Sequence, residues 1–234
     1  MSLAAFEYDQ FVALLRQLTV DDWSRPTECT LWDVKALVAH NLGNMEANAS
    51  FPQMLHQLRV ATKRSKATGN LMIDEMTALQ VGERDHLTGS ELVSRVEGIA
   101  RKALKGRRKM PGPIRRWVRV AAPPPLVSMR LGYLVDNIYT RDVWMHRVDI
   151  SRATGREMVL QPGHDGRVVS TIVCDWASQH GQSYDLVLEG PAGGAFRRGG
   201  DGEHYQLDAV EFCRIVSGRN DAAALGLLGT KVLF

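Results

Sequence analysis

The stretch RDVWMHRVDI, residues 141 to 150, places charged side chains on a helix face that is otherwise apolar. At about 100° per residue, Asp142, His146 and Asp149 fall in the middle of that face. Burying an unpaired charge costs several kcal/mol, so this helix needs something that neutralises its polar residues. The apolar residues of the same face are Leu131, Leu134, Val135, Ile138 and Met145.

Length and composition limit the number of domains and the class of protein. The 234 residues suit one large domain or two small ones, and 44% hydrophobic with 24% charged residues is typical of a soluble globular protein. No apolar run approaches the roughly 20 residues of a membrane span. The N-terminal MSLAAFEYDQF lacks the pattern of a secretory signal. Three widely spaced cysteines indicate neither a disulfide framework nor a thiolate zinc cluster, and favour a reducing cytoplasm.

Positive charge is concentrated in one segment. Between Gly98 and Val135 there are ten Lys and Arg residues and no acidic residue, most of them in residues 101–119. A solvated helix end and loop is one interpretation of this segment, and an electropositive wall for a small anionic ligand is another. Nucleic-acid binding is disfavoured, because the net charge is only +3 and no nucleic-acid motif is present.

The first two thirds of the chain predict a bundle of four main helices with one long crossover. Thr30, with Asp33 three residues later, predicts the cap of the second helix, and Thr88 or Ser90 that of a later one. Five prolines at 111, 113 and 123–125 argue against regular helix between residues 110 and 128. The helical segments expected are 6–18, 30–51, 70–80, 88–105 and a last helix from residue 131.

After Gly155 the pattern changes. Short strand patterns with glycine-rich turns replace the long amphipathic stretches, which predicts a second, small α/β domain. We place the boundary near Gly155, within ten residues, giving domains 1–155 and 156–234. The expected strands are 184–190, 193–200 and 203–208, and the expected helices are 165–180, 208–219 and 220–229.

Asp142 and His146 are four residues apart, so both project from one helix face. That spacing suits two ligands of one metal ion, and catalytic zinc usually takes three protein ligands. The pair alone is a weak signal. His40 is the best candidate for the third ligand, because it lies away from the apolar stripe of its helix, beside Ala36, Gly43 and Ala47.

Other interpretations of these residues stay open. His40 alone is equally consistent with a solvent-facing histidine. Asp142 and His146 are also consistent with a buried salt bridge, a type of contact that adds little net stability. Asp149 is interpreted as a structural carboxylate, either orienting an imidazole or linking to the second domain.

Two segments, CTLWDVKALVAHNLGN and YTRDVWMHRVDISRATGR, resemble signatures of the mycothiol-dependent maleylpyruvate isomerase family in the DinB-like superfamily. The later LVLEGPAGGAFRRGG and YQLDAVEFCRIVSGR resemble its C-terminal domain, a sterol carrier protein-like unit. The resemblance implies a DinB-like four-helix bundle that holds a divalent metal, usually zinc, through His40, Asp142 and His146. The family's isomerase has Glu where this chain has Asp142. A functional arginine of the C-terminal domain matches Arg219, which also suits a helix-end cation.

The same resemblance implies an enzyme that activates mycothiol for isomerisation of a small electrophile, or for S-transfer to it. The alternative is a non-catalytic small-ligand-binding module with a degenerate metal site. The expected partners are a small electrophile and a low-molecular-weight thiol, without nucleic acid or membrane, in a monomer or homodimer. No cysteine of the chain is assigned as nucleophile, and Arg115, Arg116 and Arg119 are candidates to bind a substrate carboxylate.

Overall fold

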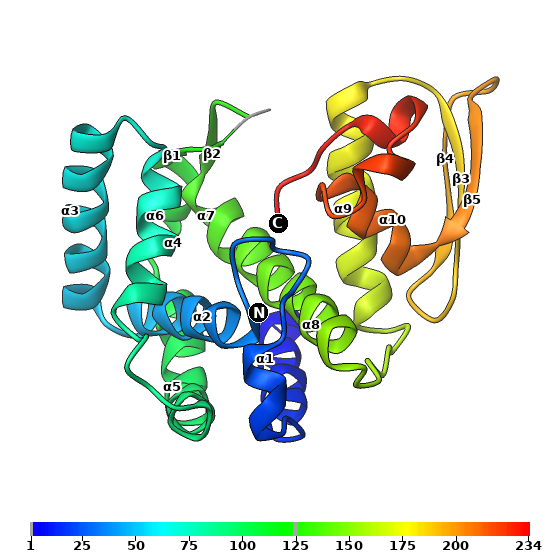
Figure 1. Cartoon of the computed structure of the whole chain (residues 1–234). Helices are drawn as coiled ribbons and strands as arrows, with labels where there is room; N and C mark the ends of the chain where they lie inside the picture. Colours follow the sequence, from blue (N-terminus) through cyan, green and yellow to red (C-terminus); the bar gives the residue numbers. More distant parts are fainter. Residues whose placement is uncertain (1, 124–125) are drawn as a thin grey trace. The chain divides into compact units, whose positions relative to one another are not determined.

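The computed structural model describes residues 2–123 and 126–234. The chain divides into a helical unit that ends at Glu157 and a C-terminal unit, Met158–Phe234 (Figure 1). Most of the described chain is helical, and the only larger sheet belongs to the C-terminal unit. The predicted class, a helical bundle followed by a small region that combines helices with a sheet, is confirmed. Among the described residues, no helix has the length and apolar character needed to cross a membrane.

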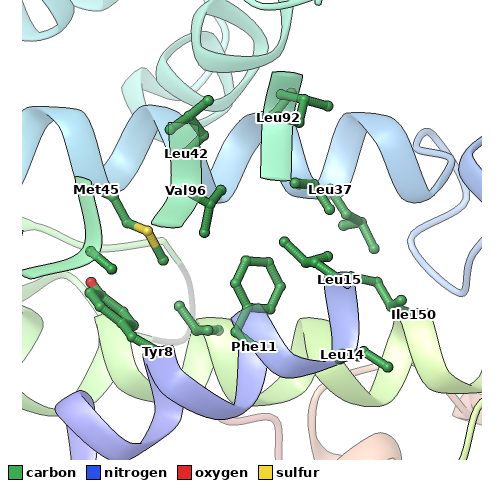
Figure 2. Packing of buried hydrophobic residues seen from close by; sticks show 14 of the residues in the cluster. Tyr8, Phe11, Leu14, Leu15, Leu37, Leu42, Met45, Leu92, Val96 and Ile150 are labelled. Carbon is green, nitrogen blue, oxygen red and sulfur yellow. The ribbon is translucent and has the colours of Figure 1, made fainter. Parts of the chain in front are cut away.

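The helical unit is built around one buried apolar cluster (Figure 2). Four helices each contribute a fully buried side chain to it: Phe11, Leu42, Val96 and Ile150. These helices are the four members of the bundle, and the others pack around them. In chain order the elements are α1 (Ser2–Leu15), η1 (Val20–Ser24), α2 (Val34–Ala49), α3 (Phe51–Thr68), α4 (Met72–Gly82), α5 (Gly89–Lys109), α6 (Gly112–Trp117), β1 (Arg119–Ala121), β2 (Ser128–Arg130), α7 (Leu131–Tyr133), η2 (Leu134–Ile138) and α8 (Tyr139–Thr154).

At the N-termini of α2 and α5, the capping residue is the one whose side chain accepts a hydrogen bond from a backbone N–H of the first turn. Asp33 caps α2, because its carboxylate accepts a hydrogen bond from the Ala36 N–H at 2.8 Å. The prediction of Thr30 as this cap was wrong: Thr30 lies three residues before the cap, in the preceding loop. At α5, Thr88 and Glu91 form a reciprocal capping box, so Thr88 and not Ser90 is the cap.

Helix α3 was missed by the sequence analysis, because most of its side chains are polar. Only Gln57 and Ala61 are buried in it, so its apolar stripe is too short to give a helical period. Gln57 instead anchors α3 to α2 by donating a hydrogen bond to the Gly43 carbonyl at 2.9 Å. Ser50 at the N-cap and Gly69 at the left-handed C-cap mark the ends of this helix.

The basic, proline-rich segment folds more regularly than predicted. Pro111 and Pro113 stand at the cap and the first turn of α6, where the N–H group that proline lacks would have no helical partner anyway. The chain then forms the antiparallel hairpin β1–β2. Pro123 lies in its loop, and Pro124 and Pro125 lie outside the described residues.

The last bundle helix begins with a π-helical segment, η2, in which the Tyr139 N–H bonds to the Leu134 carbonyl five residues earlier. The widened turn leaves the Val135 carbonyl to Arg107, whose guanidinium donates to it and, at 2.8 Å, to the Thr140 hydroxyl. Arg107 is fully buried. Arg107 is therefore an exception to the interpretation of the basic segment as a solvated helix end and loop.

The C-terminal unit places a three-stranded sheet beside two helices. Its strand order is β4-β3-β5, with β3 antiparallel to β4 and parallel to β5. The three strands were predicted, whereas the helix expected over residues 220–229 is replaced by two short 3-10 turns. Gly226, with φ of 53°, falls inside the expected helix and interrupts it. The elements are α9 (Asp165–His180), β3 (Tyr184–Glu189), β4 (Gly194–Arg198), β5 (Glu203–Asp208), α10 (Ala209–Val216), η3 (Asp221–Ala223) and η4 (Gly226–Gly229).

Candidate metal centre

Helix α8 carries two polar residues that face each other one turn apart. The Nε2 atom of His146 lies 3.3 Å from Oδ1 of Asp142. His146 is buried, while the Asp142 side chain keeps 18% of its surface exposed. The pair therefore opens toward solvent on the carboxylate side.

Helix α2 brings the third predicted residue to the same place. The Nε2 atom of His40 lies 3.3 Å from Oδ2 of Asp142, so each carboxylate oxygen faces one imidazole. The two imidazole rings meet edge to face, with centroids 5.5 Å apart. One nitrogen from each histidine and one carboxylate oxygen all lie within 4.8 Å of one another. The structure thus joins residues separated by 102 positions in the sequence.

Asp149 holds the far side of the His146 ring. Its Oδ2 atom lies 2.9 Å from Nδ1 of His146, and the residue is fully buried. A carboxylate at this distance accepts a hydrogen bond from Nδ1–H, so Nε2, which faces Asp142, is the nitrogen that would ligate a metal once its proton is lost. Cys29 also reaches this carboxylate, with Sγ 3.6 Å from Oδ2.

Trp32 covers the two imidazoles from the loop that precedes α2. Its ring centroid lies 5.1 Å from that of His40 and 6.3 Å from that of His146. Thr27 fixes this loop by donating its hydroxyl to the Trp32 carbonyl at 2.7 Å. Sequence analysis missed both Trp32 and Cys29, because neither lies on a helix face shared with a predicted ligand.

The charges of the cluster are strongly coupled. Burial would raise the pKa of Asp142, but the His146 and His40 imidazoles outweigh it and hold that pKa well below its usual range. Burial would lower the pKa of His146, but the Asp142 carboxylate and the hydrogen bond to Asp149 raise it well above the usual value. Without a metal, the cluster therefore favours a carboxylate paired with an imidazolium. A metal ion would have to displace that proton.

The donor set fits a divalent cation such as zinc. Two imidazole nitrogens and a carboxylate oxygen are ligands that catalytic zinc takes, at about 2.0–2.2 Å. Tetrahedral ligands at that bond length stand about 3.3–3.6 Å apart, and the two nitrogen-to-oxygen separations are 3.3 Å. His40 Nδ1 is buried and has no hydrogen-bond partner in the described part of the chain.

The phenol rings of Tyr8 and Tyr139 and the guanidinium of Arg107 form a wall of the site beside Asp142. Arg107 donates to the Tyr8 hydroxyl at 3.2 Å and lies over the rings of Tyr8 and Tyr139. Burial raises the pKa of Tyr139 to about 12, and the negative charge of Asp142 adds to the rise while Arg107 opposes it. Both phenols therefore stay protonated at neutral pH, and the wall carries the single positive charge of Arg107.

The other predicted residues lie elsewhere. Arg219 follows α10 in the C-terminal unit, half-buried, and its N–H donates to the Arg214 carbonyl at 2.9 Å. Arg115 and Arg116 lie on α6 and line a cavity of the helical unit. Arg119 is used within the β1–β2 hairpin, where its Nε donates to the Ser128 hydroxyl at 3.0 Å.

Fold and cluster together define a helical-bundle protein with a two-histidine, one-carboxylate candidate metal centre. A family profile described as the mycothiol maleylpyruvate isomerase N-terminal domain matches residues 5–151, well over half of the chain. The protein belongs to this family. The profile spans the bundle and all three residues of the cluster.

Two solved structures share the fold across both units. They are crystal structures of the mycothiol-dependent maleylpyruvate isomerase and of a histidine-to-alanine mutant of it, each with a TM-score of 0.59. Sequence identity is 17% and 16%, and each match covers 93% of this chain and 87% of the other. At this identity the likeness establishes the fold. Among curated proteins, no significant match is found.

Proposed function

We propose that the protein is a metal-dependent enzyme that uses mycothiol to isomerise a small electrophile or to join the mycothiol thiol to it as an S-conjugate. The observation that carries this proposal is the meeting of His40, Asp142 and His146 around one point, in a bundle of the mycothiol maleylpyruvate isomerase family. The setting we infer is a reducing cytoplasm, in which a low-molecular-weight thiol stays reduced.

In this proposal His40, Asp142 and His146 hold a divalent cation, with zinc the first choice. A bound cation would supply positive charge that lowers the pKa of a thiol and favours the reactive thiolate. Asp142 is one methylene shorter than the glutamate that the family resemblance implies. Its two oxygens nevertheless reach both imidazoles at 3.3 Å, which supports aspartate as a competent ligand here.

Three neighbours serve the ligands. Asp149 fixes the His146 tautomer through the Nδ1 hydrogen bond of 2.9 Å. Trp32 covers the imidazoles and limits the access of water to them. Tyr139 stays neutral beside Asp142, so it offers a hydroxyl donor without adding charge to the site.

Arg219 remains our candidate for a catalytic arginine of the C-terminal unit. A guanidinium binds a carboxylate through two parallel hydrogen bonds, which an ammonium does not reproduce. If Arg219 contacts substrate, Arg219→Lys raises KM almost as much as Arg219→Ala does. If it serves only as a helix-end cation, Arg219→Lys keeps the wild-type kinetics.

The first test is metal content, measured by elemental mass spectrometry on dialysed protein. We expect about one equivalent of a divalent metal in the wild type, almost none in His146→Ala, and wild-type content in His86→Ala. His86 is exposed in the loop before α5, so it controls for loss of a histidine as such. The metal-loaded protein is then assayed with maleylpyruvate and other small electrophiles, with and without mycothiol.

A second candidate function is a non-catalytic small-ligand-binding module. It is favoured by the ion pairs that Asp142 forms with both imidazoles, since these neutralise the cluster without any metal. A wild-type protein that takes up no metal after reloading with excess zinc would support this module and overturn the catalytic proposal.

A further inference from the structure

Outside the candidate metal centre, the helical unit has a cavity of about 460 Å³ in its basic segment. We propose that this cavity binds a small organic polyanion, bearing phosphate or carboxylate groups, through the guanidinium groups of Arg116 and Arg130. The two arginines come from different elements, α6 and β2, and line the same cavity. The proposal does not depend on a metal at the other site.

The charge of the cavity is unbalanced. Arg115 is ion-paired with Asp136 and donates a second hydrogen bond, at 2.8 Å, to the Arg107 carbonyl. Arg116 and Arg130 have no acidic partner in the described part of the chain. The fold therefore places two solvent-exposed, uncompensated guanidinium groups in one open surface pocket. A bound anion relieves their repulsion.

The chemistry of the lining suits an oxyanion. Guanidinium groups bind phosphate and carboxylate through paired hydrogen bonds, and Tyr133 and Asn137 add neutral polar groups to the same cavity. The Asp136 carboxylate, which would repel an anion, is neutralised by Arg115. The side chain of Arg116 is also oriented, since its guanidinium carbon lies 5.3 Å from the Trp117 ring centroid.

The volume of the cavity and the glycines that line it indicate that its ligand is an organic molecule and not a single small ion. Cavities that bind organic ligands have volumes of roughly 300–1,000 Å³, a range that includes this one. Gly132 lets its segment approach α6 closely, because a Cβ there would lie 2.8 Å from the Arg115 carbonyl oxygen. A Cβ at Gly112 would meet nothing within 4 Å, so the cavity is open at that side.

The test is isothermal titration of the full chain at low ionic strength, with inorganic pyrophosphate and citrate as probes. The double variant Arg116→Ala/Arg130→Ala is compared with Arg101→Ala/Lys102→Ala, which removes equal charge from exposed positions on α5. We expect the cavity variant to lose at least about tenfold in affinity and the control to keep wild-type affinity. Fluorescence of the exposed Trp117, beside Arg116, provides a second readout.

The probes distinguish the two sources of negative charge. Preference for pyrophosphate assigns a phosphorylated ligand, and preference for citrate assigns a polycarboxylate. The variant His146→Ala, which removes a proposed metal ligand, should bind the preferred probe as wild type does, so failure of the metal centre and failure of this site are separable. Absence of binding at millimolar probe, or equal loss in both charge variants, would overturn the proposal.

Discussion

Two neighbouring residues of α8 enter two different kinds of buried polar contact. Arg147 donates to both oxygens of Glu7 at 3.0 Å, and both side chains are almost fully buried. His146 faces Asp142, whose side chain remains 18% exposed, and His40 stands on the other carboxylate oxygen. One contact pairs a cation that cannot lose its proton with a carboxylate. The other assembles groups that can exchange a proton for a metal.

The difference shows that buried charge alone does not mark a site. Glu7 and Arg147 cancel each other in a fixed geometry, with a guanidinium that cannot ligate a cation. The cluster of His40, Asp142 and His146 instead offers three lone-pair donors that converge from two helices. What distinguishes the site is the chemistry of its donors and its partial access to solvent.

The largest expected effect comes from breaking the buried pair of Arg147 and Glu7. Arg147→Ala leaves Glu7 buried without its guanidinium, and we expect the free energy of unfolding to fall by about 3–5 kcal/mol, measured by urea denaturation. Arg152→Ala is the control, because its pair with Glu28 is half-exposed and should contribute less than about 1 kcal/mol. Equal losses in both variants would contradict the comparison.

Removing a donor from the cluster should act on metal affinity. We expect His146→Ala to bind zinc at least about 100-fold more weakly than wild type, measured by competition with a chromogenic chelator. Arg147→Ala, assayed below its unfolding temperature, should keep near-wild-type zinc affinity. A reversed order of the two variants would mean that the metal, if bound, uses other groups.

Replacing Asp149, the carboxylate that orients His146, should reduce zinc affinity less than removing His146 does. Asp149→Asn keeps the size of the side chain but removes the negative charge of the carboxylate that is hydrogen-bonded to His146 Nδ1. We expect zinc affinity to fall about 10–100-fold, with the secondary structure unchanged in circular dichroism. Cys29→Ser, which replaces the weaker contact to the same carboxylate, should change affinity much less. Unchanged affinity in Asp149→Asn would remove Asp149 from the proposed site.

A third charged group, Asp22, belongs to none of the candidate metal-ligand groups among the described residues and extends the comparison to the effect of pH on stability. The hydrogen bond from the Thr19 N–H is the main cause that holds the pKa of Asp22 at about 2, against an ordinary value of 3.8, and Arg156 assists it. Because the folded-state pKa is lowered, this contribution is present above about pH 4 and is lost as pH falls toward 2. Asp22→Asn should therefore be less stable than wild type by about 1–2 kcal/mol at pH 6, and the difference should shrink as pH falls through about 2. A constant difference across this range would exclude the carboxylate charge as its cause.

The helical bundle and the pair Asp142 and His146 could be predicted from the sequence because their residues recur at helical spacing. The i, i+4 spacing of Asp142 and His146 fixes their common face whatever surrounds them. His40 was singled out by the small residues around it, as a pocket or a close helix crossing would require, and one of these residues is Gly43. A Cβ there would lie 2.7 Å from the Gln80 side chain, so Gly43 permits a close crossing of α4 and does not widen a pocket.

The parts that were missed depend on contacts that have no period. Trp32 and Cys29 reach the centre from a loop, and Cys29 is 120 residues from the Asp149 that it contacts. Helix α3 docks through the amide of Gln57 and not through an apolar stripe. Arg107 looked like one basic residue among ten, and its burial is explained by hydrogen bonds to the Tyr8 and Thr140 hydroxyls and to the carbonyl that the π-helical segment frees.

The π-helical segment Leu134–Ile138 also fixes an angular phase along the last bundle helix. A π turn holds one residue more than the α-helical ladder requires, and each residue turns an α-helix by about 100°. Because the π turn spreads one helical turn over more residues than an α turn does, deleting one residue there would restore regular helix and leave Tyr133 at nearly its present angle relative to Asp142. The segment therefore takes up one residue that, in an unbroken α-helix, would turn Tyr133, which lines the arginine cavity, by about 100° relative to the metal-ligand cluster.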